Sequence, residues 1–192
     1  AIEQVADALQ QLHVLRPVVA PAAGALQRLQ LSEASLPEAQ NVLRNLEKST
    51  AGTLSAADGL ELAGNLVLTA GTLTLGANPL TLSGATSSIT RGTGTLSSTG
   101  TVSFTGTGAQ TADLATSTLT TITASKTGGS LAFSSGFSAT AFTIGANKPF
   151  DLSFNTAAAQ ATSIAGAVSF DNSGALTLGN DSGDSFAAAG GI

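Results

Sequence analysis

Residues 72–84 read Thr-Leu-Thr-Leu-Gly-Ala-Asn-Pro-Leu-Thr-Leu-Ser-Gly, which is two runs of strict apolar/polar alternation joined by a turn. Side chains in a β-strand alternate between its two faces with period two. We therefore expect Leu73, Leu75, Leu80 and Leu82 to share one buried face, while the threonines and the serine between them meet water. The pattern predicts two short strands that each bury a single face.

Similar runs recur along the chain. The Gly-Ala-Asn that begins at Gly76 has a second copy that begins at Gly145, and a third run of the same kind begins at Leu176. Residues 101–104 are echoed by residues 167–170, at nearly the same interval. Nearly equal intervals are typical of a chain that returns to similar environments as it advances, as in a solenoid whose coils take about 20 to 30 residues each. The intervals would then correspond to about three turns.

Short alternating runs, separated by Gly, Asn, Asp and Ser, fill the chain after Gly52. Strands this short and regular suggest a sandwich, a barrel or a solenoid, and the repeats favour a parallel β-solenoid, or β-helix. The expected strands lie at residues 60–62, 66–69, 72–75, 80–83, 101–105, 118–123, 131–134, 141–144, 150–154, 167–170 and 175–178. The phenylalanines expected to form a ladder in its interior are Phe104, Phe133, Phe142, Phe150, Phe154 and Phe170.

The first fifty residues differ from the rest. Apolar residues at three- and four-residue spacing predict an amphipathic helix at about residues 2–15 and a second at 22–31. A Ser-Leu-Pro-Glu capping box that begins at Ser35 predicts a third helix at about 36–48. We therefore expect a helical segment over residues 1–50, either a cap for the solenoid or an assembly module, followed by the β-solenoid domain over 51–192.

Charge separates the same two parts and limits the partners. Eleven of the nineteen charged residues lie within the first sixty-one positions. The net charge of −5, with only seven scattered basic residues, argues against nucleic acid as a partner. No run of about twenty apolar residues occurs, so no membrane span is expected. A surface kept soluble by Thr, Ser and Asn is typical of proteins outside cells.

The segments 71–76, 92–96, 104–111 and 174–180, rich in Gly, Thr and Leu, resemble the β-strand repeats of large secreted bacterial surface proteins. Those proteins are the filamentous-haemagglutinin-like and autotransporter-like adhesins. The resemblance covers about residues 52–192 and rests on composition. It implies export to the cell surface, a right-handed parallel β-helix, and a role in adhesion or surface structure. Residues 1–50 do not belong to the pattern.

One segment has the chemistry of a cation site. Asn180, Asp181 and Asp184 gather oxygen ligands around a glycine turn, as calcium requires, and Asp171 with Asn172 could contribute from the preceding coil. The alternative is a polar turn in which the same oxygens accept local backbone amides. No other cofactor is expected.

Catalytic constellations are scarce. The one histidine, His13, has no acidic partner at helical spacing, so a surface or interface role is favoured. A glycosidase needs two facing carboxylates, and Asp151 is the only late acid inside an expected strand. Threonine pairs such as Thr72/Thr74 and Thr118/Thr120 also fit an ice-binding surface.

We therefore expect a non-enzymatic, extracellular structural or adhesive solenoid of a bacterial cell surface. It would associate with itself or with a neighbouring surface protein, and a glycan is a further candidate ligand. The alternative function is a subunit of a self-assembling extracellular filament or surface layer. An ice-binding or polysaccharide-active solenoid is a weaker alternative.

Overall fold

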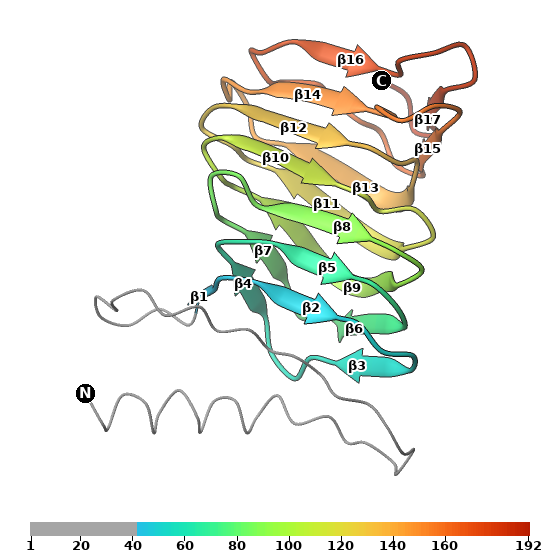
Figure 1. Cartoon of the computed structure of the whole chain (residues 1–192). Coiled ribbons are helices and arrows are strands. Elements are labelled where there is room, and N and C mark those ends of the chain that lie inside the picture. Colours follow the sequence, from blue (N-terminus) through green and yellow to red (C-terminus); the bar gives the residue numbers. More distant parts are fainter. Residues whose placement is uncertain (1–41) are drawn as a thin grey trace.

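The computed structural model describes residues 42–192, and this part of the chain is a parallel β-solenoid (Figure 1). Every strand pair in it is parallel, because the chain always returns to the next turn in the same direction. Leu46 pairs with Leu66, whereas Leu152 pairs with Leu176, so the turns are not all of the same length. Within residues 42–192 there is no helix that is long and apolar enough to cross a membrane.

The turns build two sheets, which form the walls of the solenoid. The ten-stranded sheet, sheet A, contains β1 (Val42–Leu43), β3 (Thr53–Ser55), β4 (Leu60–Leu62), β6 (Thr72–Gly76), β7 (Leu80–Leu82), β9 (Thr95–Phe104), β11 (Thr118–Ala124), β13 (Ser138–Ile144), β15 (Ala161–Ile164) and β17 (Ser185–Ala188). The seven-stranded sheet, sheet B, contains β2 (Leu46–Lys48), β5 (Leu66–Leu68), β8 (Ser88–Arg91), β10 (Ala109–Ala112), β12 (Ser130–Phe133), β14 (Asp151–Phe154) and β16 (Leu176–Leu178).

The two strands predicted in residues 72–84 are β6 and β7. Both pair with the long strand β9, so they follow one another along the same sheet instead of folding back as a hairpin. Leu73, Leu75, Leu80 and Leu82 are all buried, as predicted. The register of sheet A shifts between Thr74 and Gly76, where the chain leaves β6 for the turn to β7.

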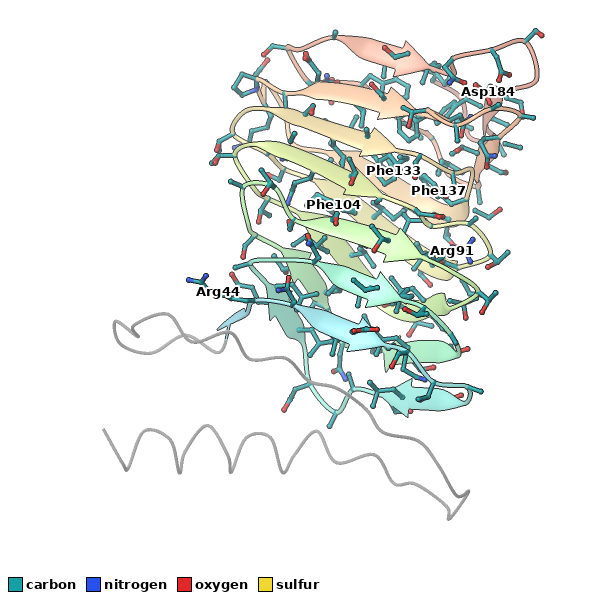
Figure 2. The ribbon with its side chains drawn as sticks, viewed as in Figure 1. Arg44, Arg91, Phe104, Phe133, Phe137 and Asp184 are labelled. Atoms are coloured by element: carbon teal, nitrogen blue, oxygen red, sulfur yellow. The ribbon has the colours of Figure 1, made fainter. Side chains whose placement is uncertain are left out.

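The interior is mainly apolar along the whole solenoid, and its phenylalanines, among them Phe104, Phe133 and Phe137, all lie after residue 100 (Figure 2). The predicted phenylalanine ladder is confirmed: five of the six rings are buried, and Phe170 packs partly buried against them. Phe137 and Phe186 join the same cluster. Each buried ring stabilises the fold by about 1.5 to 3 kcal/mol.

The two sequence repeats have different structural meanings. Val102 pairs with Ile122 and Ile122 with Phe142, and the Gly166 N–H donates to the Thr140 carbonyl one turn before it. Residues 167–170 therefore follow residues 101–104 by three turns, as expected. The Gly-Ala-Asn copies are not equivalent: the first joins β6 to β7 within sheet A, whereas the second leads from β13 to sheet B.

The third predicted helix, at 36–48, is wrong from Val42 onward. Residues 42–43 and 46–48 are β1 and β2, which pair with β4 and β5. The side chains of Leu46 and Lys48 point inward with period two, and pairing with the next turn outweighs the local helical spacing. These first strands therefore lie on the N-terminal side of the boundary expected at residue 50. The predicted helices at 2–15 and 22–31 lie outside the described residues.

The strand predictions missed some segments and added one. β3, β8, β10, β15 and β17 were not predicted, because their sequences have few large apolar residues. Residues 167–170 were predicted as a strand, but they form none.

Candidate functional site

The outer face of sheet A carries a column of hydroxyl side chains that repeats once per turn. Strand pairing places one Ser or Thr directly above the next, because parallel strands keep their register from turn to turn. Neighbouring strands in a sheet lie about 4.8 Å apart, which sets the spacing of the column. The hydroxyl column consists of Ser55, Thr74, Ser97, Thr118, Ser138 and Ser163.

The column is continuous over six turns and ends where Ser163 pairs with Ala187. A shorter row, Thr53, Thr72 and Thr95, runs beside it at the N-terminal end. The hydroxyls of Thr72 and Thr95 lie 3.0 Å apart and hydrogen-bond to each other across one turn. Outward hydroxyls on this face can therefore bond directly from one turn to the next.

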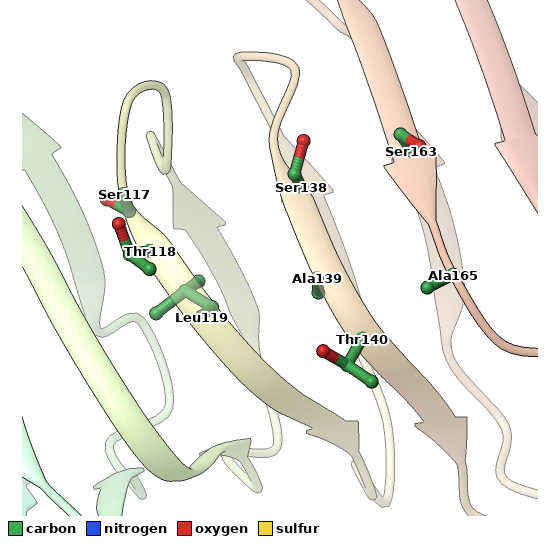
Figure 3. A pocket seen from close by; sticks show the side chains of 8 residues that line it. All are labelled: Ser117, Thr118, Leu119, Ser138, Ala139, Thr140, Ser163 and Ala165. Carbon is green, nitrogen blue, oxygen red and sulfur yellow. The ribbon is translucent and has the colours of Figure 1, made fainter.

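The C-terminal half of the hydroxyl column borders a shallow hollow of about 360 Å³ (Figure 3). Thr118, Ser138 and Ser163 are exposed there and come from the successive strands β11, β13 and β15. The register shift between Leu119 and Thr121 lies at the same level of the sheet. The residues that line the hollow are Ser117, Thr118, Leu119, Ser138, Ala139, Thr140, Ser163 and Ala165.

The hollow offers hydrogen bonds and methyl groups. Hydroxyls both donate and accept, so they suit neutral polar partners such as sugars or ordered water. A serine becomes a nucleophile only beside a general base, and the lining residues include no acid or base. The side chains that line the hollow can therefore donate and accept hydrogen bonds.

The predicted calcium ligands lie together in one loop after β16 (Figure 2). The Asp184 carboxylate accepts hydrogen bonds from the backbone N–H groups of Gln160, Asn180 and Asp181, at 2.7, 2.7 and 3.2 Å. These bonds, led by the one from Gln160, lower the pKa of Asp184. The Asp181 carboxylate accepts from the N–H groups of Gly183 and Ala159.

The carboxylates of Asp181 and Asp184 are thus bonded to backbone N–H groups of their own loop and of the preceding turn. The Asn180 side-chain amide donates to the Thr156 carbonyl, at 2.8 Å. Asp171 does not join the loop, since it accepts from the hydroxyl of Ser169. Within residues 42–192, no group of three or more His, Cys, Asp and Glu side chains could hold a metal ion. Calcium binding at Asn180, Asp181 and Asp184 stays a prediction.

Asp151, the late acid expected inside a strand, is the first residue of β14. Its carboxylate is exposed and accepts the backbone N–H of Ala175, at 2.8 Å. Asp113 pairs with Arg91, at 3.1 Å, at the opposite end of the sheet B strands. His13 lies outside the described residues.

No protein-family model matches this chain, and comparison with curated proteins and with solved structures finds no match. The likeness to bacterial adhesins is therefore a resemblance of composition.

Sequence reasoning singled out Thr74 and Thr118 but missed the hydroxyl column as a whole. Ser55, Ser97, Ser138 and Ser163 belong to segments with little alternation, and turns of unequal length hide their equivalence. Only the pairing of the strands brings these residues into line.

Proposed function

We propose that this chain is a non-enzymatic, exported β-solenoid that serves as a structural or adhesive part of a bacterial cell surface. The hydroxyl column carries this proposal, because it stays in register over six turns. A surface that repeats with every turn suits a partner that also repeats, such as a glycan chain or a neighbouring surface protein. The fold alone supports many functions, so the argument rests on this surface.

Export is tested by labelling intact source cells with an antibody against the solenoid. Labelling without permeabilisation is the expected result. Labelling only after lysis would contradict a role at the cell surface.

Adhesion is tested by the binding of purified protein to immobilised glycans and to whole cells. The triple variant Thr118→Val, Ser138→Ala, Ser163→Ala removes three hydroxyls of the column and should reduce binding. A control is Thr111→Val with Ser153→Ala, which removes two hydroxyls from the outer face of sheet B. Equal binding by both variants and the wild type would exclude adhesion through the column.

The second candidate function is a subunit of a self-assembling filament or surface layer. Leu176 and Leu178 of β16 are 40% and 42% exposed, whereas their partners in β14, Leu152 and Phe154, are fully buried. Open strand edges invite association with further strands. Electron microscopy of purified protein separates the two functions, because ordered polymers favour the filament and isolated rods favour the structural or adhesive unit.

Two weaker alternatives have direct assays. Ice binding through the hydroxyl column would produce thermal hysteresis that the triple variant loses. A polysaccharide-cleaving activity would appear as turnover that disappears in Asp151→Ala.

A further inference from the structure

One inner corner of the solenoid, where sheet A leads into sheet B, has backbone carbonyls that need buried donors. Leu82 pairs with Phe104 and Phe104 with Ala124, which places Gly84, Gly106 and Lys126 at equivalent positions two residues further on. A Cβ on Gly106 would lie 2.0 Å from the Gly84 carbonyl oxygen, so successive turns are in close backbone contact here.

Three buried polar side chains donate hydrogen bonds to the backbone carbonyls of this corner. Gln110 donates from Nε2 to the carbonyls of Leu82 and Gly84 and to Ser87 Oγ, at 2.9, 3.0 and 2.6 Å. Lys126 donates from Nζ to the Gly106 carbonyl, at 2.6 Å, and to Gln110 Oε1, at 2.9 Å. Gln110 and Lys126 are fully buried and Ser87 is nearly so. We call Ser87, Gly106, Gln110 and Lys126 the lysine corner.

The Lys126 ammonium has only neutral acceptors. The surrounding strands β7, β9, β10, β11 and β12 contain no titratable residue. The adjoining strands β8 and β14 each carry one charge: Arg91 is paired with Asp113, and Asp151 is exposed and bonded to the Ala175 N–H. The next turn over this corner carries the partly exposed Lys148, whose side chain lies near Gly145 and Ser125. A charge buried without an opposite charge loses its hydration. Burial accordingly lowers the pKa of Lys126 to about 8.

We propose that the lysine corner is a pH-responsive part of the solenoid. Its local opening costs less free energy while Lys126 is protonated and more once Lys126 has lost its proton. Opening exposes the ammonium to water, so protonation favours the open state. The neutral amine formed by deprotonation can still donate hydrogen bonds to the Gly106 carbonyl and to Gln110 Oε1.

The direction of the effect follows from proton linkage. In an open or unfolded chain a lysine has a pKa of about 10.4. Between about pH 8 and that value the open state binds more protons than the closed state, so stability rises with pH through this window. Lys48 is also buried and its pKa is lowered, so a variant must separate the two lysines.

The first test compares urea unfolding of the full chain at pH 8 and pH 10 in wild type and Lys126→Met. The unfolding equilibrium constant of the wild type should fall by about thirtyfold more than that of Lys126→Met over this range. Lys148→Met, which changes a partly exposed lysine, should keep the wild-type response. The same pH response in Lys126→Met and wild type would overturn the proposal.

The second test needs no variant and therefore stands even if Lys126→Met does not fold. Hydrogen exchange of the wild type is followed at the Thr105 and Ser125 amides, which bond to Leu82 and Phe104 beside the lysine corner. The reference amides are those of Asp113 and Ser134, which follow sheet B strands at the opposite end. After correction for intrinsic exchange, protection should rise about twentyfold more at the lysine corner between pH 7.5 and 9.5. An equal change at both ends would overturn the proposal.

Discussion

The rings of Phe133 and Phe154 stack one turn apart, with centroids 5.2 Å apart and planes inclined by 18°. Both side chains are fully buried, and each belongs to the last residue of its strand, β12 or β14. Phe104 and Phe137 also contact Phe133, and Phe142 contacts both stacked rings. The interior at this level therefore depends on rings that fit one another across turns.

Phe133→Ala should lower the free energy of unfolding by about 3 to 5 kcal/mol, because it removes a ring with no space for the neighbours to collapse into. Phe186→Ala is the matched control, since that ring is only partly buried at the edge of the same cluster. The decrease in unfolding free energy should be clearly smaller for Phe186→Ala than for Phe133→Ala. Chemical denaturation measures both, and equal losses would contradict the stacked interior.

Gly106→Ala should destabilise the solenoid by roughly 1 to 3 kcal/mol, because the added methyl group overlaps the Gly84 carbonyl of the preceding turn. The control is Gly128→Ala, where the nearest atom is the Thr107 carbonyl oxygen at 3.2 Å. Melting temperatures should separate the two variants. A Gly106→Ala protein as stable as Gly128→Ala would mean that the turns are less closely packed than described.

Asp113 should contribute to stability at neutral pH and lose its contribution in acid. Burial raises the pKa of Asp113, but hydrogen bonds from Ser135, Arg91 and Ala115 outweigh it, so the pKa lies below its usual value. The contribution is therefore complete above about pH 4 to 5 and is lost as the pH falls through the lowered pKa. Asp113→Asn should cost about 1 kcal/mol at pH 7.

The pH dependence provides the check on this prediction. The difference in unfolding free energy between wild type and Asp113→Asn should shrink as the pH is lowered from 5 to 2. A difference that stays constant over that range would show that the Asp113 charge is not responsible.

Calcium binding at Asn180, Asp181 and Asp184 has a direct test. If the ion binds there, millimolar calcium should raise the melting temperature, a chelator should reverse the rise, and Asp184→Asn should abolish it. The ion would have to compete with backbone amides for the Asp184 oxygens. A melting temperature that responds to neither calcium nor chelator would exclude the site.

The fold class followed from alternation and repeats, because Leu73, Leu75, Leu80 and Leu82 follow the period of a strand with one buried face. The alternation also located most strands with large apolar residues, as at Leu131 and Phe133. Strands such as β10, with the sequence Ala-Gln-Thr-Ala, gave no such signal. These strands form because they pair with strands of the preceding and following turns, and the local sequence carries no signal of that pairing.

The surface and the buried polar groups were less accessible to sequence reasoning. Lys126 appears in the sequence as a scattered basic residue, yet it lies inside, because the Gly106 carbonyl and Gln110 provide its acceptors. The repeated Gly-Ala-Asn suggested equivalent positions, but the two copies occupy different corners. Ile144, just before the second copy, is in register with Leu82 of β7, whereas the first copy follows β6, so the two tripeptides follow different parts of sheet A.

The unequal length of the turns has a consequence for how such a molecule can change size. Extra residues are taken up in the loops between strands and at the register shifts of sheet A, so strand pairing continues from turn to turn while the coils differ in length. Gain or loss of one complete coil would lengthen or shorten the rod by a single strand spacing, about 4.8 Å. The length of the rod can therefore evolve in equal steps by tandem duplication of coils, without a change in the sequence of any existing coil.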